Sequence, residues 1–437
     1  MHCIYRFESD SKVICKDNQV LELKQKLLRL PEKIWFRAML FCMAAILAAG
    51  SANWLGPHIP YGDDLELVSG SVGELLTILA SSMLAVIAFS VSIMVSSYSS
   101  ATGMATPRTI ALMLADDRSQ NALSTFLGTF LFSIVGIIGL SAEFYDDRGR
   151  IVLFFATIAV IFVITGTLLN WIQQLSTFGR MGDLIRRVED AACSALEWHG
   201  THPWLGAQPP IDIPADAVPI CCEDRSGVVT TIDMDALQQT AEKYDVTVHL
   251  AIYPGKLVYP TRQVMHISGA NPLEIDPQAF RDSVLVERDR SFEQDPRFGL
   301  VVLSEIASRA LSPAVNDPGT AISVLNSGLR CLERFAEARD EPEKPTHSRI
   351  HGPAVTVSDL FSDFFPKIAR DGADNFEVHK RIQMVLLALA QTWPEAFAAA
   401  SIEASQNALE RAASAIKFQP EIELLKESSK NVKRACG

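Results

Sequence analysis

The hydrophobic residues of the chain are concentrated between residues 34 and 175, in long segments that are almost free of charged side chains. A helix that crosses a bilayer needs about 20 consecutive, mostly apolar residues. Four segments reach this length, over about Ile34–Trp54, Val72–Ser97, Ala122–Ala142 and Ile151–Trp171. The pattern therefore predicts an α-helical membrane domain of four transmembrane helices over residues 34–175.

The orientation of these spans follows from the positive charges beside them, because loops rich in Lys and Arg stay in the cytoplasm. The first span starts too late and is too long for a typical cleaved signal peptide, so it is interpreted as a retained anchor. Only Arg148 and Arg150 lie on one side of the membrane. The other side carries nine basic residues: Lys24, Lys26, Arg29, Lys33, Arg108, Arg118, Arg180, Arg186 and Arg187. Both termini are therefore expected in the cytoplasm.

The second span is unusual because it combines an apolar composition with eight serines between residues 79 and 100. At about 100° per residue, its small and polar positions fall on one side of the helix. This stripe is about 44 Å long at 1.5 Å per residue. Its members are Glu74, Thr77, Ser81, Ala85, Ala88, Ser92, Ser96, Ser99 and Gly103.

Two interpretations of this stripe remain open. Small residues let helices approach closely and serines bond across them, so the stripe is explained by tight helix packing. Alternatively it lines a water-filled path in an oligomer, with Glu74, Thr77, Ser81, Ser92, Ser96 and Ser99 as the pore-lining candidates. A ring of Glu74 carboxylates near the outer mouth would then favour cations. Otherwise Glu74 is a solvated carboxylate at a helix N-terminus.

The remainder of the chain predicts a cytoplasmic α+β domain with a small β hairpin or half-barrel module and C-terminal helices. Phe178–Trp198 has helical periodicity and is expected to continue the fourth span, and residues 199–219 read as a loop. The expected parts are a tail over 1–33, a helical extension and Pro-rich loop over 176–226, a β module over 227–270, helices over 271–338, a charged linker over 339–353, and C-terminal helices with a frayed tail over 354–437.

The β module is predicted from short runs in which apolar and polar residues alternate, such as Val246–Ile252; such runs are typical of half-buried strands. Its turns resemble the half-barrel hairpin of biotinyl- and lipoyl-type modules, which carry a modified lysine at an exposed tip. We find no lysine in that context and expect a structural module. His249 and His266 flank the hairpin strands and are interpreted as structural.

The run from Arg309 to Ala321 predicts a helix, a break and a second helix. Pro313 helps end the first helix, and Asp317 followed by Pro318 is a strong start for the second. Glu305, Arg309, Asn316 and Asp317 cluster here. They fit a polar ligand pocket, although such a cluster is more often a capped helix junction with a salt bridge, or a subunit contact.

Other chemistry is weakly indicated. His199-x-x-His202 and Cys221-Cys222 could hold zinc, but zinc ligands more usually sit in paired motifs on fixed secondary structure. The sequence holds no nucleophile elbow, Walker loop or dinucleotide fingerprint. The net charge of −12 gives no sign of a nucleic-acid partner, and the eight cysteines lack the spacing of a disulfide framework. We expect no enzyme activity, metal or cofactor.

The stretch EQDPRFGLVVLSEIASRALSPAVNDPGTA (293–321) resembles the signature of a bacterial predicted-membrane-protein family, the domain-of-unknown-function family 2254. The serine-rich second span, the four-span layout and the hairpin VHLAIYPGKLVYPTRQV agree with it. Ala-Val before Asn-Asp-Pro, and Gly after it, depart from the expected Gly-Ile and Phe and should alter turn packing more than fold. The resemblance implies a multi-pass protein of the bacterial inner membrane and no known activity.

The function expected from these patterns is a homo-oligomeric, channel-like permeation protein in the lipid bilayer, with the second span lining a path for a small ion. The alternative is a membrane-anchored scaffold or sensor whose cytoplasmic domain binds a ligand or partner, without permeation. An enzyme at the membrane face is the least supported class, because no catalytic constellation is visible.

Overall fold

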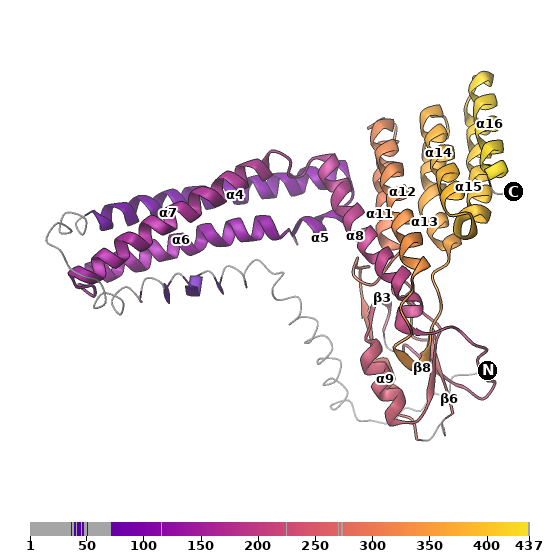
Figure 1. The fold of residues 1–437 in the computed structure, drawn as a ribbon, viewed down its shortest axis with the longest axis horizontal. Helices are drawn as coiled ribbons and strands as arrows, with labels where there is room; N and C mark the ends of the chain where they lie inside the picture. The colour runs from indigo at the N-terminus through magenta and orange to yellow at the C-terminus, as the bar shows by residue number, and fades with distance from the viewer. Residues whose placement is uncertain are drawn as a thin grey trace. The chain divides into compact units, whose positions relative to one another are not determined.

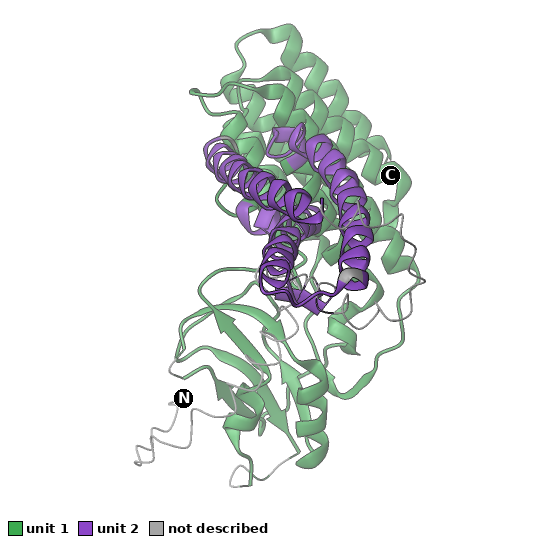
Figure 2. Ribbon diagram, turned by 90° about the vertical axis from the view of Figure 1, so that its left-hand side faces the viewer, with its two compact units in different colours: residues 1–24, 104–109, 184–437 green, residues 25–103, 110–183 purple. Residues whose placement is uncertain are grey.

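The structure is a computed structural model that describes residues 71–114, 116–223, 225–269, 271, 274–435 and nine positions between 36 and 50. The predicted tail over 1–33 lies outside the described residues. The first predicted span, Ile34–Trp54, also lies outside them except at those nine positions, which are helical. The chain forms two compact units, drawn in different colours in Figure 2. Unit 2 comprises residues 25–103 and 110–183, and unit 1 comprises residues 1–24, 104–109 and 184–437.

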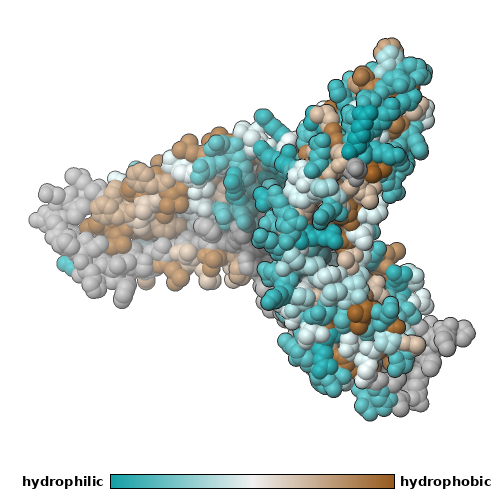
Figure 3. Space-filling model, turned by 45° about the vertical axis from the view of Figure 1, so that its right-hand side comes forward, coloured by the Kyte–Doolittle hydropathy of each residue, from teal (hydrophilic) through white to brown (hydrophobic). Residues whose placement is uncertain are grey.

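The described part of unit 2 contains three long apolar helices that lie side by side: α4 (Val72–Met104), α6 (Asp117–Ser141) and α7 (Asp147–Leu175) (Figure 1). Each is long and apolar enough to cross a bilayer. They correspond to the second, third and fourth predicted spans. Compared with the predicted limits, α4 is longer at its C-terminus, α6 at its N-terminus and α7 at both ends. The space-filling view shows a largely hydrophobic surface over these helices (Figure 3), as a lipid-facing surface requires.

The three helices are joined by an apolar cluster and by side-chain hydrogen bonds. The cluster contains Val72, Leu76, Phe132, Tyr145 and Leu153. The indole Nε1 of Trp171 donates to Ser90 Oγ at 2.9 Å, which ties α7 to α4. The Gln174 side chain donates to Asp116 Oδ2 at 2.6 Å, beside the N-terminus of α6.

The helix that follows α7 is a separate element, α8 (Met181–Thr201). This corrects the prediction that the fourth span continues into the cytoplasm as one helix. Gly179 between them has a φ of +75°, a backbone conformation that ends the α-helical hydrogen-bond ladder. A short helix, α5 (Thr109–Leu114), follows Pro107.

Unit 1 contains two small sheets. The five-stranded sheet has the order β1 (Ala207–Gln208), β8 (His347–His351), β4 (Thr247–Leu250), β6 (Gln263–Ser268) and β2 (Val218–Cys221). The three-stranded sheet has the order β5 (Leu257–Val258), β3 (Gly227–Ile232) and β7 (Val284–Glu287). Strand β8 pairs in parallel with both β1 and β4, and the other pairings are antiparallel.

One face of the five-stranded sheet is the core of this region. Val248, Met265 and Ile350 from three neighbouring strands are fully buried there. The amphipathic helix α9 (Met234–Lys243) adds Leu237 and Ala241 to the same core. Burial of this apolar face is the main stabilising contribution.

These sheets correct three expectations. The β module is no half-barrel hairpin, because β3 pairs with β5 and β7, and β4 pairs with β6 and β8. Residues 199–219 contain the end of α8, a 3₁₀ turn over Pro203–Gly206 and strand β1. The segment 339–353, predicted as a linker, contributes strand β8 between β1 and β4.

The rest of unit 1 is a helical bundle, labelled at the upper right of Figure 1. Helix α10 is a short turn over Pro277–Arg281. The remaining helices are α11 (Phe298–Ala310), α12 (Pro318–Asp340), α13 (Val357–Asp371), α14 (Phe376–Thr392), α15 (Pro394–Ala415) and α16 (Gln419–Ala435). Five of them match predicted helices. The sixth, α16, corrects the prediction of a frayed tail, because Ile422, Leu425 and Val432 are buried against its neighbours.

Candidate functional site

The serine stripe lies on the exposed side of α4. All nine of its positions, from Glu74 to Gly103, are exposed in the single chain. The opposite side of the same helix is buried, at Val72, Leu76, Ala80, Met83 and Met94. Helices α6 and α7 therefore do not cover the stripe, and the small residues are not used for packing within this three-helix group.

The hydroxyl groups along the stripe fall into two sets. Thr77 Oγ1 donates to the Gly73 carbonyl at 2.8 Å and Ser81 Oγ donates to the Thr77 carbonyl at 2.9 Å. Such back-bonding satisfies a hydroxyl inside an apolar medium. Within the described part of the chain, Ser92, Ser96 and Ser99 make no side-chain hydrogen bond. Their hydroxyls can accept partners from outside the chain.

Large apolar side chains flank the stripe on both sides. Ile78 and Phe89 are 63% and 64% exposed on one side, and Leu84 and Val91 are exposed on the other. At 100° per residue these residues border the stripe at similar angles. The exposed side of α4 is therefore a polar strip between two apolar strips. This pattern suits a helix whose flanking apolar side chains contact lipid while the stripe between them does not.

The four junction residues do not form one pocket. Glu305 lies on α11, where its Oε2 accepts a hydrogen bond from Arg108 Nη1 at 2.6 Å and its Oε1 lies 3.9 Å from Lys367 Nζ. Arg108 belongs to Met104–Thr109, the segment after α4 that groups with unit 1. Glu305 therefore takes part in two ion pairs.

The other three residues of that set have separate surroundings. Arg309 is exposed on the last turn of α11. Asn316 has a φ of +50° in the break between the helices. Asp317 caps α12 as predicted, with its carboxylate accepting from the Thr320 hydroxyl and backbone N–H. These hydrogen bonds lower the pKa of Asp317.

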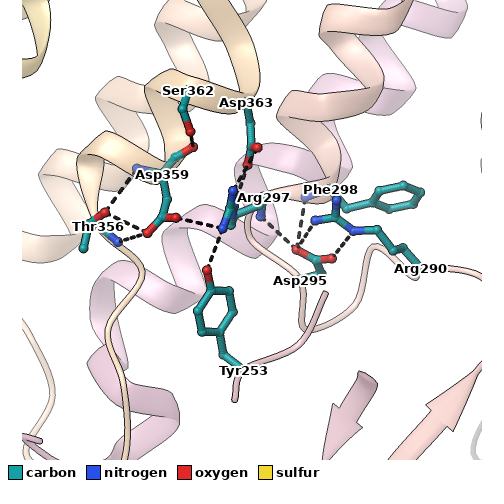
Figure 4. Close-up of polar contacts among 9 residues, drawn as sticks. All are labelled: Tyr253, Arg290, Asp295, Arg297, Phe298, Thr356, Asp359, Ser362 and Asp363. Atoms are coloured by element: carbon teal, nitrogen blue, oxygen red, sulfur yellow. Dashed lines mark hydrogen bonds and ion pairs between the residues drawn. The ribbon is translucent and has the colours of Figure 1, made fainter. Parts of the chain in front are cut away.

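A denser polar cluster surrounds Arg297, which the sequence did not single out (Figure 4). Its guanidinium donates twice to Asp363 at 2.5 and 2.9 Å, once to Asp359 at 2.8 Å and once to the Tyr253 hydroxyl at 2.6 Å. The paired Asp363 carboxylate raises the pKa of Arg297. This cluster joins the segment after β4 to the start of α11 and to the first half of α13. The spacing of four between the two aspartates was its one visible signal in the sequence.

Next to this cluster, Asp295 starts α11 and is 1% exposed. Its carboxylate pairs with Arg290 through two hydrogen bonds of 2.7 and 2.9 Å and accepts the backbone N–H groups of Arg297 and Phe298. A buried carboxylate with this many donors is fully compensated. Figure 4 shows both arginines turned toward their carboxylates, so the arrangement is structural.

A groove of about 330 Å³ opens beside α13. Its polar lining includes Ser362 and Asp363 together with three cations, Lys367, Arg370 and Arg411. Asp363 is already paired with Arg297 and Asp371 with Arg370. Arg411 has no ion-pair partner within the described residues. Because Lys367 also lies 3.9 Å from Glu305, Arg411 is the lining cation that can attract an anion to the groove.

The residues considered for zinc have other partners. His199 Nε2 bonds to the Gln294 carbonyl at 2.8 Å, and His202 Nε2 lies 3.3 Å from Glu343. Burial lowers the pKa of His199 to about 4, so it is neutral at pH 7. Among the described residues no group of three or more His, Cys, Asp or Glu side chains is arranged to hold a metal ion.

His249 and His266 face each other on β4 and β6. His249 Nε2 contacts Ser268 Oγ at 2.9 Å, and its ring stacks on His351 of β8 with centroids 5.6 Å apart. Burial lowers the pKa of both His249 and His266. These contacts agree with the structural interpretation.

Comparison with known proteins gives a family and no activity. Two relatives are the uncharacterized protein Rv1290c of Mycobacterium tuberculosis and the uncharacterized protein Mb1321c of Mycobacterium bovis, each 28% identical over 311 residues. The match covers 65% of this chain and 57% of either relative, so the chain spans little more than half the length of these proteins. No solved structure matches the chain. A family model described as "Predicted membrane protein (DUF2254)" matches residues 31–388, and the chain therefore belongs to this family of predicted membrane proteins.

Proposed function

We propose that the protein is a homo-oligomeric, channel-like permeation protein of the bacterial inner membrane, with α4 lining the path. The observation that carries the proposal is the exposed stripe, which runs from Glu74 to Gly103 along a helix that is otherwise apolar. Its small side chains leave space along the helix, and its hydroxyls offer hydrogen bonds to water or a partly dehydrated ion.

The stripe is unsuited to face lipid. A hydroxyl without a hydrogen bond in an apolar medium costs roughly 2–7 kcal/mol. With Ser92, Ser96 and Ser99 on it, exposure of this face to lipid would carry a large free-energy cost. The stripe therefore requires either water or a further helix beside it. Several copies of α4 arranged around an axis would supply a water-filled path and remove the stripe from lipid in one step.

Glu74 gives the proposed path a preference for cations. It stands in the first turn of α4, at the end that the positive charges assign to the outer face. One carboxylate per subunit would form a ring at the outer mouth. In this arrangement unit 1 is the assembly platform or gate on the cytoplasmic side.

The test is ion flux through proteoliposomes that contain the purified protein or one of two leucine variants. Ser92→Leu places a bulky side chain on the stripe. Ser82→Leu is the matched control, because Ser82 is exposed on the same helix beside the flanking Phe89 and bonds back to Leu79. We expect flux from the wild type and from Ser82→Leu, and its loss in Ser92→Leu with the oligomer size unchanged.

Two other outcomes contradict the proposal. If Ser92→Leu breaks the oligomer while Ser82→Leu does not, the stripe is a helix-packing surface. If neither the wild type nor any variant conducts under voltage, osmotic and pH steps, the permeation function is wrong.

The second candidate function is a membrane-anchored scaffold or sensor. The observation that favours it is the groove with Lys367, Arg370 and Arg411, which is suited to an anionic ligand or partner. This reading predicts no flux from the wild type, so the same proteoliposome experiment separates the two candidates.

A further inference from the structure

Helices α8 and α12 run parallel and in contact within unit 1. In the pairs of residues that contact each other, the residue numbers increase together along both helices, so the helices run in the same direction. A Cβ placed on Gly200 would lie 2.6 Å from Ala338 Cβ, so the backbones approach closely at that level. The remaining pairs, in chain order, are Glu189 with Arg330, Cys193 with Cys331, and Glu197 with Arg334.

The pair Cys193 and Cys331 places two free thiols against each other. Cys193 Sγ and Cys331 Sγ are 3.0 Å apart, about 1 Å longer than a disulfide bond. The bidentate contact of Arg330 with Glu189, at 2.5 and 2.7 Å, fixes the helices one turn away. A small shift of two side chains would bring the sulfur atoms into bonding distance.

The two thiols differ in access to solvent. Cys193 is half-buried, whereas Cys331 is fully buried and also contacts the Glu189 carbonyl at 3.7 Å. The hydrogen bond from Cys331 lowers the pKa of Cys193, and the same hydrogen bond and burial raise the pKa of Cys331. An accessible, more acidic thiol beside a buried partner is the arrangement found in redox-sensing cysteines.

We propose that Cys193 and Cys331 form a redox modification site, in which a hydroperoxide converts the two thiols reversibly into a disulfide between α8 and α12. The Cys193 thiolate attacks one peroxide oxygen, the O–O bond breaks and an alcohol or water leaves. Cys193 becomes a sulfenic acid. The sulfur of Cys331 then attacks the Cys193 sulfur, its proton leaves with the hydroxyl as water, and the S–S bond forms.

The electrons balance, because two thiols lose two electrons and the peroxide gains them. A cellular dithiol reverses the reaction by exchange. The orientation predicted from the positive charges places unit 1 in the cytoplasm, where disulfides are transient and usually redox-sensing. The disulfide would fix α8, the helix that follows the last span, against α12.

The test uses the full chain, purified in detergent and reduced, and then treated with stoichiometric hydrogen peroxide. Free thiols are alkylated, and the digest is analysed by mass spectrometry. We expect a cross-linked pair of peptides that contains Cys193 and Cys331, and its disappearance after treatment with dithiothreitol. Cys331→Ser should trap the sulfenic acid, so that dimedone labels Cys193.

The matched control is the adjacent pair Cys221, the last residue of β2, and Cys222 directly after it, neither of which forms a disulfide in the described structure. Cys222→Ser should leave the Cys193–Cys331 cross-link unchanged. The proposal is overturned if Cys193 and Cys331 remain fully alkylated at a dose that oxidises Cys221, or if Cys193 cross-links to another cysteine instead.

Discussion

Arg297 joins three parts of unit 1 through one guanidinium. Its partners are Tyr253 after β4, and Asp359 and Asp363 on α13 (Figure 4). The guanidinium and the Asp363 carboxylate are each less than one-fifth exposed. Two carboxylates therefore depend on one cation for compensation at a site with limited solvent access.

Replacing this cation is expected to be more harmful than replacing an exposed one. Arg297→Met leaves Asp359 and Asp363 without their cation and should destabilise unit 1 by about 3 kcal/mol. The control is Arg349→Met, whose partner Asp245 is 85% exposed. It should cost less than about 1 kcal/mol. Thermal unfolding of the full chain in detergent measures both, and equal midpoints would contradict the assigned role.

At this scale the sequence predicted local contacts and missed distant ones. The cap made by Asp317 is confirmed, because it depends only on residues three positions away. The partner of Glu305 is Arg108, which is 197 residues earlier in the chain. Such a pair follows from the tertiary fold, and no periodicity or local motif indicates it.

Whole helices were predictable where their apolar residues repeat with the helical period, as over Phe178–Trp198, most of which forms α8. Their limits and breaks depend on single residues that the period does not reveal. Gly179 separates α7 from α8 with a φ of +75°, and an added Cβ would lie 3.0 Å from Ser97 Cβ. The break therefore requires glycine for both its backbone conformation and its space.

Two glycines three residues apart allow a matched test of this requirement. Gly179→Ala should destabilise the protein by about 1–2 kcal/mol, because alanine is strained at a positive φ. Gly182→Ala lies inside α8 with no atom within 4 Å of the added methyl group, and should stabilise it by up to about 1 kcal/mol. Urea denaturation in detergent compares the two. A loss of stability in both variants would contradict this account of the break.

Strand β8 shows why the sheets were less predictable than the helices. Its sequence, His-Ser-Arg-Ile-His, is polar and has one buried apolar residue, Ile350. Nothing in five such residues signals a strand. They become one because their backbone pairs with β1 and β4, which come from distant parts of the chain.

For the whole molecule, composition and hydropathy predicted the division into a membrane part and an α+β part. Within the described residues, the second, third and fourth predicted spans are helices of sufficient length. The charge asymmetry around these spans predicts an orientation with the α6–α7 turn outside and unit 1 inside.

This orientation can be tested with single cysteines in a chain whose native cysteines are serine. Ala142→Cys lies in the exposed turn after α6, and Asp212→Cys lies in the exposed segment between β1 and β2. A membrane-impermeant maleimide added to intact spheroplasts should label the first position and leave the second unlabelled. Permeabilised cells provide the control for accessibility, and the reverse labelling pattern would show the opposite orientation.

The placement of β8 between β1 and β4 also has a consequence for synthesis on the ribosome. When residues 207–268 have emerged, β1 has no neighbour and β4 has an open edge, and both remain so until β8, which follows α11 and α12, has been made. Unpaired strand edges are the sites at which nascent chains associate wrongly. A chain released before residue 347 would keep these edges open after its membrane helices are complete. Quality control of a truncated product would therefore have to act on a protein that is already in the membrane.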